Sequence, residues 1–226
     1  MSDIIKKQIE LYRSNFLSNS DSPEGVFWNN TTTQFERFNQ LITPLLYYRP
    51  SGFSICDIGS GVCDLHQFLL DKKIDHAYTG IEIIEEMITK ARDKFKDIDV
   101  KKTDILSDGI KKKYDFVVSS GTFNLRGKIS EDEWKVYIFK MLKQMFEMAE
   151  IGISFNVLTS YSTFRAPELF YSSPEEMTHF IQTELSRFYQ LNSAYPLYEI
   201  TYTVIKEKHI SEKFSHEHFT KYFSKK

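Results

Sequence analysis

Hydrophobic and polar residues follow two different periods along this chain, and the change of period marks the expected elements. Short apolar runs at residues 53–58, 78–82, 114–118 and 151–158 predict buried strands, because polar or glycine-containing turns bound each run. A further strand is expected to begin at residue 100. Helical patterns separate these runs. Alternating strands and helices are typical of an α/β fold with a parallel sheet.

The helices are predicted by apolar spacing and by capping residues. Apolar side chains recur at helical spacing in residues 3–17 and 83–95. Thr33 is expected to cap a second helix ahead of the first strand. Ser130, followed by Glu-Asp-Glu, opens a capping box and a long helix. Ser173 precedes a proline, which favours the first turn of another helix.

Two more strands are expected near the C-terminus, at residues 188–192 and 198–206. The second alternates apolar and polar residues, as an antiparallel strand with one solvated face does. Residues 207–226 form a charged tail with phenylalanines at loose helical spacing, which predicts a small terminal helix.

A glycine-rich turn follows the first strand and precedes a helical pattern. It reads Asp57-x-Gly59-x-Gly61. Glycines there let the backbone approach a ligand, and a helix start offers N–H groups and a positive dipole end. This arrangement favours a nucleotide-like cofactor. Asp64 stands where a dinucleotide fingerprint needs a small residue, and its carboxylate would repel a pyrophosphate, so NAD and FAD are disfavoured. Asp57 can instead hold an ammonium group.

Two later strand ends also carry carboxylates. Glu82 ends the second strand, and an acid there is suited to accept both hydroxyls of a ribose. The alternative is that Glu82 is an ordinary acid at a helix start. Asp104 follows the third strand, where a simple turn aspartate is the alternative.

These features together resemble the class I S-adenosylmethionine (SAM) methyltransferases over roughly residues 50–206. Their motif I reads acidic-x-Gly-x-Gly-x-Gly, and this chain has Cys63 in place of the third glycine. The resemblance implies a Rossmann-like, seven-stranded, mostly parallel sheet with an antiparallel last strand, helices on both faces and an N-terminal helical lid. Segments such as Gly-Val-Phe-Trp-Asn at residues 25–29 look like the trans-aconitate methyltransferase-like group of small-molecule enzymes.

The same resemblance implies SAM as cofactor, S-adenosylhomocysteine as product, and a set of cofactor-binding residues. Asp104 is expected beside the adenine amino group, Ile105 against the ring, and Arg37 beside the methionine carboxylate. Trp28 as loop packing and Arg37 as a solvated helix residue are the alternatives. The full cofactor set is Asp57, Gly59, Ser60, Gly61, Glu82, Ile83, Asp104, Ile105, Ser120, Trp28 and Arg37.

Length and charge narrow the picture further. A chain of 226 residues suits one α/β domain, with residues 1–48 as a lid, 53–206 as the catalytic sheet and 207–226 as a tail. The formal charge of −2 does not indicate a basic surface of the kind that binds nucleic acid. No apolar stretch reaches membrane-spanning length, and the N-terminus lacks a secretory core, so a cytoplasmic location is expected. The two cysteines indicate neither disulfides nor a metal pair. The oligomeric state stays open.

Methyl transfer is an in-line displacement that mainly needs alignment and exclusion of water. No metal is expected, and Tyr161 and His179 are the candidates for a catalytic role. Residues 119–123 lack the Asn/Asp-Pro-Pro-Tyr pattern of many nitrogen methyltransferases, so transfer to an oxygen of a small metabolite is favoured, with an anion as one candidate. The predicted acceptor-binding residues are Tyr12, Asn124, Arg126, Tyr161 and Arg165. An RNA or protein methyltransferase and a non-catalytic SAM-binding scaffold are the alternatives.

Overall fold

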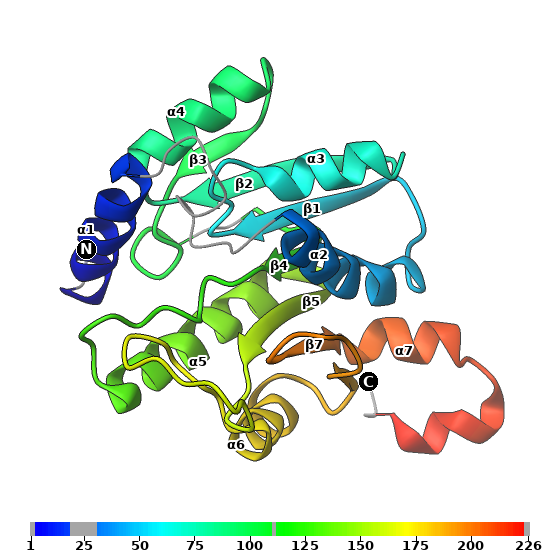
Figure 1. Ribbon diagram of the computed structural model, residues 1–226. Coiled ribbons are helices and arrows are strands. Elements are labelled where there is room, and N and C mark those ends of the chain that lie inside the picture. The colour runs from blue at the N-terminus through cyan, green and yellow to red at the C-terminus, as the bar shows by residue number, and fades with distance from the viewer. Residues whose placement is uncertain (1–2, 19–30, 110–111, 224–226) are drawn as a thin grey trace.

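Seven strands form one mixed sheet in a computed structural model that describes residues 3–18, 31–109 and 112–223 (Figure 1). The strand order is β3-β2-β1-β4-β5-β7-β6. Neighbours are parallel except at β7, which is antiparallel to both β5 and β6. The strands are β1 Phe53–Ile58, β2 His76–Glu82, β3 Val100–Lys102, β4 Tyr114–Ser119, β5 Ala149–Leu158, β6 Tyr189–Asn192 and β7 Glu199–Ile205. The predicted Rossmann-like sheet is confirmed.

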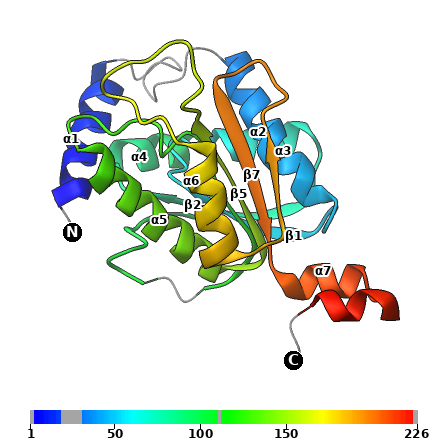
Figure 2. The same cartoon turned by 90° about the horizontal axis from the view of Figure 1, so that it is seen from below.

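Helices cover both faces of this sheet (Figures 1 and 2). One apolar cluster joins the sheet to side chains of α2, α3 and α4, and another joins it to α5 and α6. The helices are α1 Asp3–Ser18, α2 Thr31–Leu46, α3 Asp64–Asp71, α4 Glu85–Lys94, α5 Glu131–Met148, α6 Pro174–Phe180 and α7 Glu207–Lys213. A π-helical turn, Ile181–Leu185, extends α6, and a 3₁₀ helix, Glu217–Tyr222, follows α7. None of the helices in the described ranges is long and apolar enough to cross a bilayer.

The alternating pattern of β7 predicted an antiparallel strand, and this is confirmed. Its polar positions do not face solvent, because every residue of β7 is buried. The reason is that β7 pairs on both edges and helices cover both faces, so its threonines must find partners inside. Thr203 Oγ1 lies 3.3 Å from Ser154 Oγ, and Thr201 Oγ1 lies 2.9 Å from the Tyr195 hydroxyl. Hydrogen bonding removes the cost of burying these hydroxyls.

The capping residues in the sequence predicted two helix starts correctly and one incorrectly. Ser130 Oγ accepts the backbone N–H of Glu133 at 3.3 Å, and Ser173 Oγ accepts that of Glu176 at 3.2 Å, as predicted. The second helix instead begins at Thr31, two residues before the expected cap.

We expect the Ser130 cap to contribute measurably to stability. Ser130→Ala should lower the free energy of unfolding by about 1 kcal/mol, because an N–H at the start of α5 loses its partner. Urea denaturation measures this. Ser215→Ala, at an exposed serine outside any helix, is the matched control and should change stability little. Equal effects of the two variants would show that the cap is not stabilising.

Candidate active site

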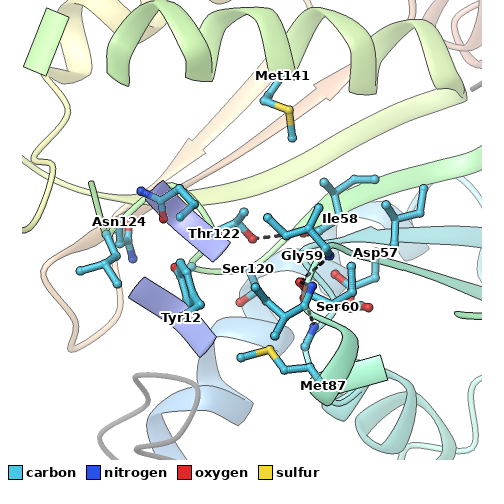
Figure 3. A pocket seen from close by; sticks show the side chains of 18 of the residues that line it. Tyr12, Asp57, Ile58, Gly59, Ser60, Met87, Ser120, Thr122, Asn124 and Met141 are labelled. Atoms are coloured by element: carbon cyan, nitrogen blue, oxygen red, sulfur yellow. Dashed lines mark hydrogen bonds between the residues drawn. The ribbon is translucent and has the colours of Figure 1, made fainter. Parts of the chain in front are cut away.

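A cavity of about 410 Å³ lies at the carboxyl ends of the parallel strands. This volume is within the range of small-molecule sites, roughly 300–1,000 Å³. Its lining comes from α1, α2 and α5, from the loops after β1 to β5, and from the start of β7. Figure 3 shows Tyr12, Ser120, Thr122 and Asn124 around the cavity, with Asp57, Gly59 and Ser60 beside it. The topology therefore gathers side chains that are far apart in the sequence.

The glycine turn after β1 is tightly confined. Gly59 has a φ of 72°, and a Cβ added there would lie 2.3 Å from Thr122 Oγ1. Only glycine fits without displacing the side chain of Thr122, in the loop after β4. Cys63, where the motif pattern has its third glycine, also adopts a left-handed φ of 62°. A glycine would take that conformation without strain, whereas other residues lose roughly 1–2 kcal/mol.

Glu82 joins the glycine turn to the end of β2. Its Oε2 accepts the Gly61 N–H at 2.8 Å, and its Oε1 accepts the N–H groups of Ile83 at 2.6 Å and Ile84 at 3.0 Å. The side chain is buried, and burial raises its pKa while these three backbone N–H groups lower it. Ile84 is the N-cap of α4, so Glu82 does not cap this helix; its carboxylate bonds the two N–H groups just ahead of it. A carboxylate has about four acceptor positions, so one remains for a ligand.

Asp57 is buried next to the same turn and lines the cavity. One carboxylate oxygen accepts the Tyr78 hydroxyl at 2.8 Å. Burial raises the pKa of Asp57 to about 7; the Tyr78 hydrogen bond lowers it, and the charges of Glu82 and Asp64 raise it further. Near neutral pH this carboxyl is therefore partly protonated. A cation placed beside it would favour the ionised form.

The expected adenine residues also line the cavity. Asp104 uses its carboxylate within its own turn, accepting the Leu106 N–H at 3.1 Å and the Ser107 hydroxyl. Ile105 is buried beside it. On the opposite side of the glycine turn, Ser120 Oγ is buried without a hydrogen-bond partner among the described residues, and it borders the cavity.

Only part of the predicted acceptor set is brought together. Tyr12 and Asn124 line the cavity. Arg126 does not, because its guanidinium holds the loop after β5. It donates to four backbone carbonyls, those of Gly127 at 3.5 Å, Ile129 at 2.7 Å, Pro167 at 2.6 Å and Leu169 at 3.3 Å. The structure thus gives Arg126 a structural contact in place of the expected contact with an anion.

The remaining acceptor and catalytic candidates lie on the surface, outside the cavity. Arg165 is exposed, donates to the Ser160 carbonyl at 2.5 Å and lies over the Tyr171 ring. Tyr161 is 71% exposed and its hydroxyl donates to Glu175 at 2.6 Å. His179 is exposed on α6. Their loop and helix positions follow from α6 packing against α5 and not toward the strand ends. Trp28 lies outside the described residues.

Arg37 is held by an acid that the sequence interpretation missed. Its Nε lies 2.8 Å from both carboxylate oxygens of Glu199, the first residue of β7. Asn124 Nδ2 donates to the same carboxylate at 3.3 Å. Glu199 is 2% exposed; burial raises its pKa, and Arg37 opposes that shift. The only sequence signal was an acid at the start of an otherwise uncharged strand. Arg37 therefore contacts a protein carboxylate where a cofactor carboxylate was expected.

The cavity as a whole is acidic. Its described lining has six carboxylic side chains against a single cationic one, Arg37. The six acids are Asp57, Asp64, Glu82, Asp104, Glu168 and Glu199. A cavity of this charge favours ligands that carry positive charge or hydrogen-bond donors.

Comparison with known proteins identifies the family. None of the protein-family models matches the chain. It is 33% identical over 156 residues to a Mycobacterium tuberculosis protein named "Putative methyltransferase Rv1506c", covering 68% of this chain and 93% of that protein. Magnesium protoporphyrin IX methyltransferase from Synechocystis PCC 6803, solved with bound SAM, has the same fold, with a TM-score of 0.62 and 13% identity over 88% of this chain and 96% of that one. The chain belongs to the class I SAM-dependent methyltransferases.

This methyltransferase also resembles an enzyme that acts on an oxygen. It is 33% identical over 122 residues to the malonyl-[acyl-carrier protein] O-methyltransferase of Acetivibrio thermocellus. That match covers 53% of this chain and 41% of the relative. The trans-aconitate methyltransferase-like subgroup stays a prediction.

Replacing Gly59 in this methyltransferase should be more damaging than replacing another glycine of similar backbone. Gly59→Ala adds a clash with Thr122 to the strain of a positive φ. Gly109→Ala is the matched control, since its φ is +61° but nothing lies within 4 Å of the added Cβ. We expect a loss of about 1 kcal/mol for Gly109→Ala and clearly more for Gly59→Ala in urea unfolding. Equal losses of unfolding free energy in the two variants would show that the Thr122 side chain moves aside without cost.

Proposed function

We propose that this methyltransferase binds SAM across the ends of β3, β2 and β1 and transfers the methyl group to an oxygen of a small metabolite. The observation that carries the proposal is the joint placement of Asp104, Glu82 and Asp57 along one cavity. These acids end successive neighbouring strands. Strands lie about 4.8 Å apart, so the row is suited to an extended nucleoside with an amino-acid arm.

Each end of the row suits a different part of the cofactor. Ile105 and Asp104 would hold the adenine ring and its amino group, and the remaining acceptor position of Glu82 would take a ribose hydroxyl. Asp57 would hold the methionine ammonium. The unpartnered hydroxyl of Ser120 would give the ligand a further polar contact, and the packing of Gly59 against Thr122 holds the glycine turn beside the cavity.

The bound cofactor supplies an activated methyl group on a sulfonium, so the protein's own task is alignment and exclusion of water. The N-terminal helices support this role: Tyr12 of α1 and Phe38 of α2 both border the cavity. Transfer to oxygen draws support from the Acetivibrio relative, which is an O-methyltransferase. An anionic acceptor draws none from Arg126 or Arg165, since both guanidinium groups contact the protein outside the cavity.

The ribose role of Glu82 is tested by removing its carboxylate. The remaining acceptor position of Glu82 would give one charge-assisted hydrogen bond of roughly 1.5–3 kcal/mol, which the variant would lose. We therefore expect Glu82→Ala to weaken S-adenosylhomocysteine binding at least about tenfold in calorimetric titration. Glu85→Ala, at an exposed acid in the first turn of α4, is the control and should bind normally. Unchanged affinity in Glu82→Ala would leave the residue as a helix-start acid only. Binding without turnover on any metabolite would instead favour a SAM-binding scaffold.

The Asp57 role predicts a pH dependence. Because burial raises the pKa of Asp57 to about 7, a cationic ligand must pull a proton from this carboxyl below that pH. SAM affinity should therefore rise between about pH 6 and pH 8, by at most tenfold per unit on the acidic side. Asp57→Asn should remove this dependence. Tyr78→Phe removes the hydrogen bond that lowers the pKa and should move the midpoint to higher pH. A flat profile in the unaltered protein would contradict the role.

A further inference from the structure

The half of the cavity farthest from the glycine turn is lined by a buried carboxylate, that of Glu199. We propose that Glu199 selects the methyl acceptor, and that this acceptor is a small alcohol, with or without an amino group, that presents O–H or N–H donors and carries no carboxylate or phosphate. The inference rests on the proposed function, because it assumes that the cofactor occupies the other half.

Sheet order locates this half. If SAM follows β3, β2 and β1, the space left for an acceptor lies over β4, β5 and β7. Glu199 pairs in register with Leu158, the last residue of β5, and stands three strands from β1. At about 4.8 Å per strand, its backbone is about 14 Å to the side of β1. Its carboxylate therefore borders the acceptor half of the cavity, away from the glycine turn.

The contacts of Glu199 hold its carboxylate in place without using all of it. Arg37 Nε bridges both oxygens at 2.8 Å, and Asn124 Nδ2 reaches Oε1 at 3.3 Å. Asn124 is itself fixed, because its Oδ1 accepts the Leu158 N–H at 3.0 Å. Oε1 thus receives two donors and Oε2 one. Since each oxygen has two lone pairs, Oε2 keeps one acceptor position for a ligand.

A second acceptor atom in the cavity is independent of this network. Gln8 on α1 is 3% exposed and lines the cavity. Because the Nε2 of Gln8 donates to the Arg126 carbonyl at 3.4 Å, the Oε1 of the same amide points away from that carbonyl. That Oε1 is buried without a hydrogen-bond partner among the described residues. A buried acceptor of this kind is stabilised by a donor, and a ligand with O–H or N–H groups would supply it.

An anionic acceptor would have to compete with Glu199 for the guanidinium group of Arg37. Arg37 is the single cationic side chain of the described cavity lining, and Glu199 already binds it. A carboxylate ligand that took Arg37 would leave a nearly fully buried Glu199 without its main partner. Two carboxylates would then share one guanidinium in a cavity that also contains Asp57 and Glu82. Breaking a buried ion pair in this way is strongly unfavourable.

The test uses cofactor analogues that carry a probe into the acceptor half. In three analogues of S-adenosylhomocysteine, nitrogen replaces sulfur and bears a 3-aminopropyl, 3-hydroxypropyl or 2-carboxyethyl arm. Calorimetric titration gives their dissociation constants. We expect the aminopropyl and hydroxypropyl analogues to bind at least about tenfold more tightly than the carboxyethyl analogue. In Glu199→Gln this preference should shrink to within about threefold, while S-adenosylhomocysteine itself binds as before.

Two further variants act as controls. Glu168→Gln removes an exposed carboxylate that borders the same cavity, and it should keep the full preference. Arg37→Gln/Glu199→Gln removes both charges of the pair, so it tests selectivity if the single variant fails to fold. Equal or tighter binding of the carboxyethyl analogue, or a preference unchanged in the Glu199 variants, would overturn the inference alone. Failure of S-adenosylhomocysteine and all three analogues to bind would overturn the proposed function, and this inference with it.

Discussion

The carboxylate of Glu82 connects the two strand ends on which the candidate site depends. It accepts one N–H group from the glycine turn after β1 and those of Ile83 and Ile84, which lie between β2 and α4. These groups would otherwise be unpaired at buried strand ends, where an unsatisfied donor costs about 1–3 kcal/mol. The bonds thus fix the position of Gly61 relative to the end of β2. Gly61 and Glu82 both line the adjoining cavity, so these bonds also fix part of its wall. The same interaction explains why a strongly buried acid is tolerated there.

Burial of acids is the common electrostatic theme of the site. Asp57, Glu82 and Glu199 are each buried, and the pKa of each is raised by that burial. They differ in what opposes the shift: a tyrosine hydroxyl for Asp57, backbone N–H groups for Glu82 and a guanidinium for Glu199. The three carboxyl groups therefore respond differently to a cationic ligand. Asp57, whose shift is opposed by a single neutral hydroxyl, is the one most sensitive to it.

The N-terminal helices complete the site from outside the sheet. Helices α1 and α2 contribute Gln8, Tyr12 and Arg37 to the cavity lining. That these helices act as a lid stays a prediction. What the resemblance did not indicate is that Arg37 is joined to the far end of the chain through Glu199, 162 residues away. That ion pair joins the N-terminal helices to the last strand of the sheet.

Sequence patterns by themselves determined the fold and the strand ends at which acids line the cavity. Strand ends followed by Asp57-x-Gly59-x-Gly61, Glu82 and Asp104 are local signals, because each residue lies next to the strand that positions it. The rest of the cavity lining was decided only by the tertiary structure. Arg126 and Arg165 followed the right strands, yet nearby carbonyl groups hold their guanidinium groups outside the cavity. Glu199 carried almost no local signal. Its role depends on β7 inserting antiparallel beside β5, which brings the start of one strand to the end of another. Such long-range pairing is set by packing of the whole sheet and not by any neighbouring residues.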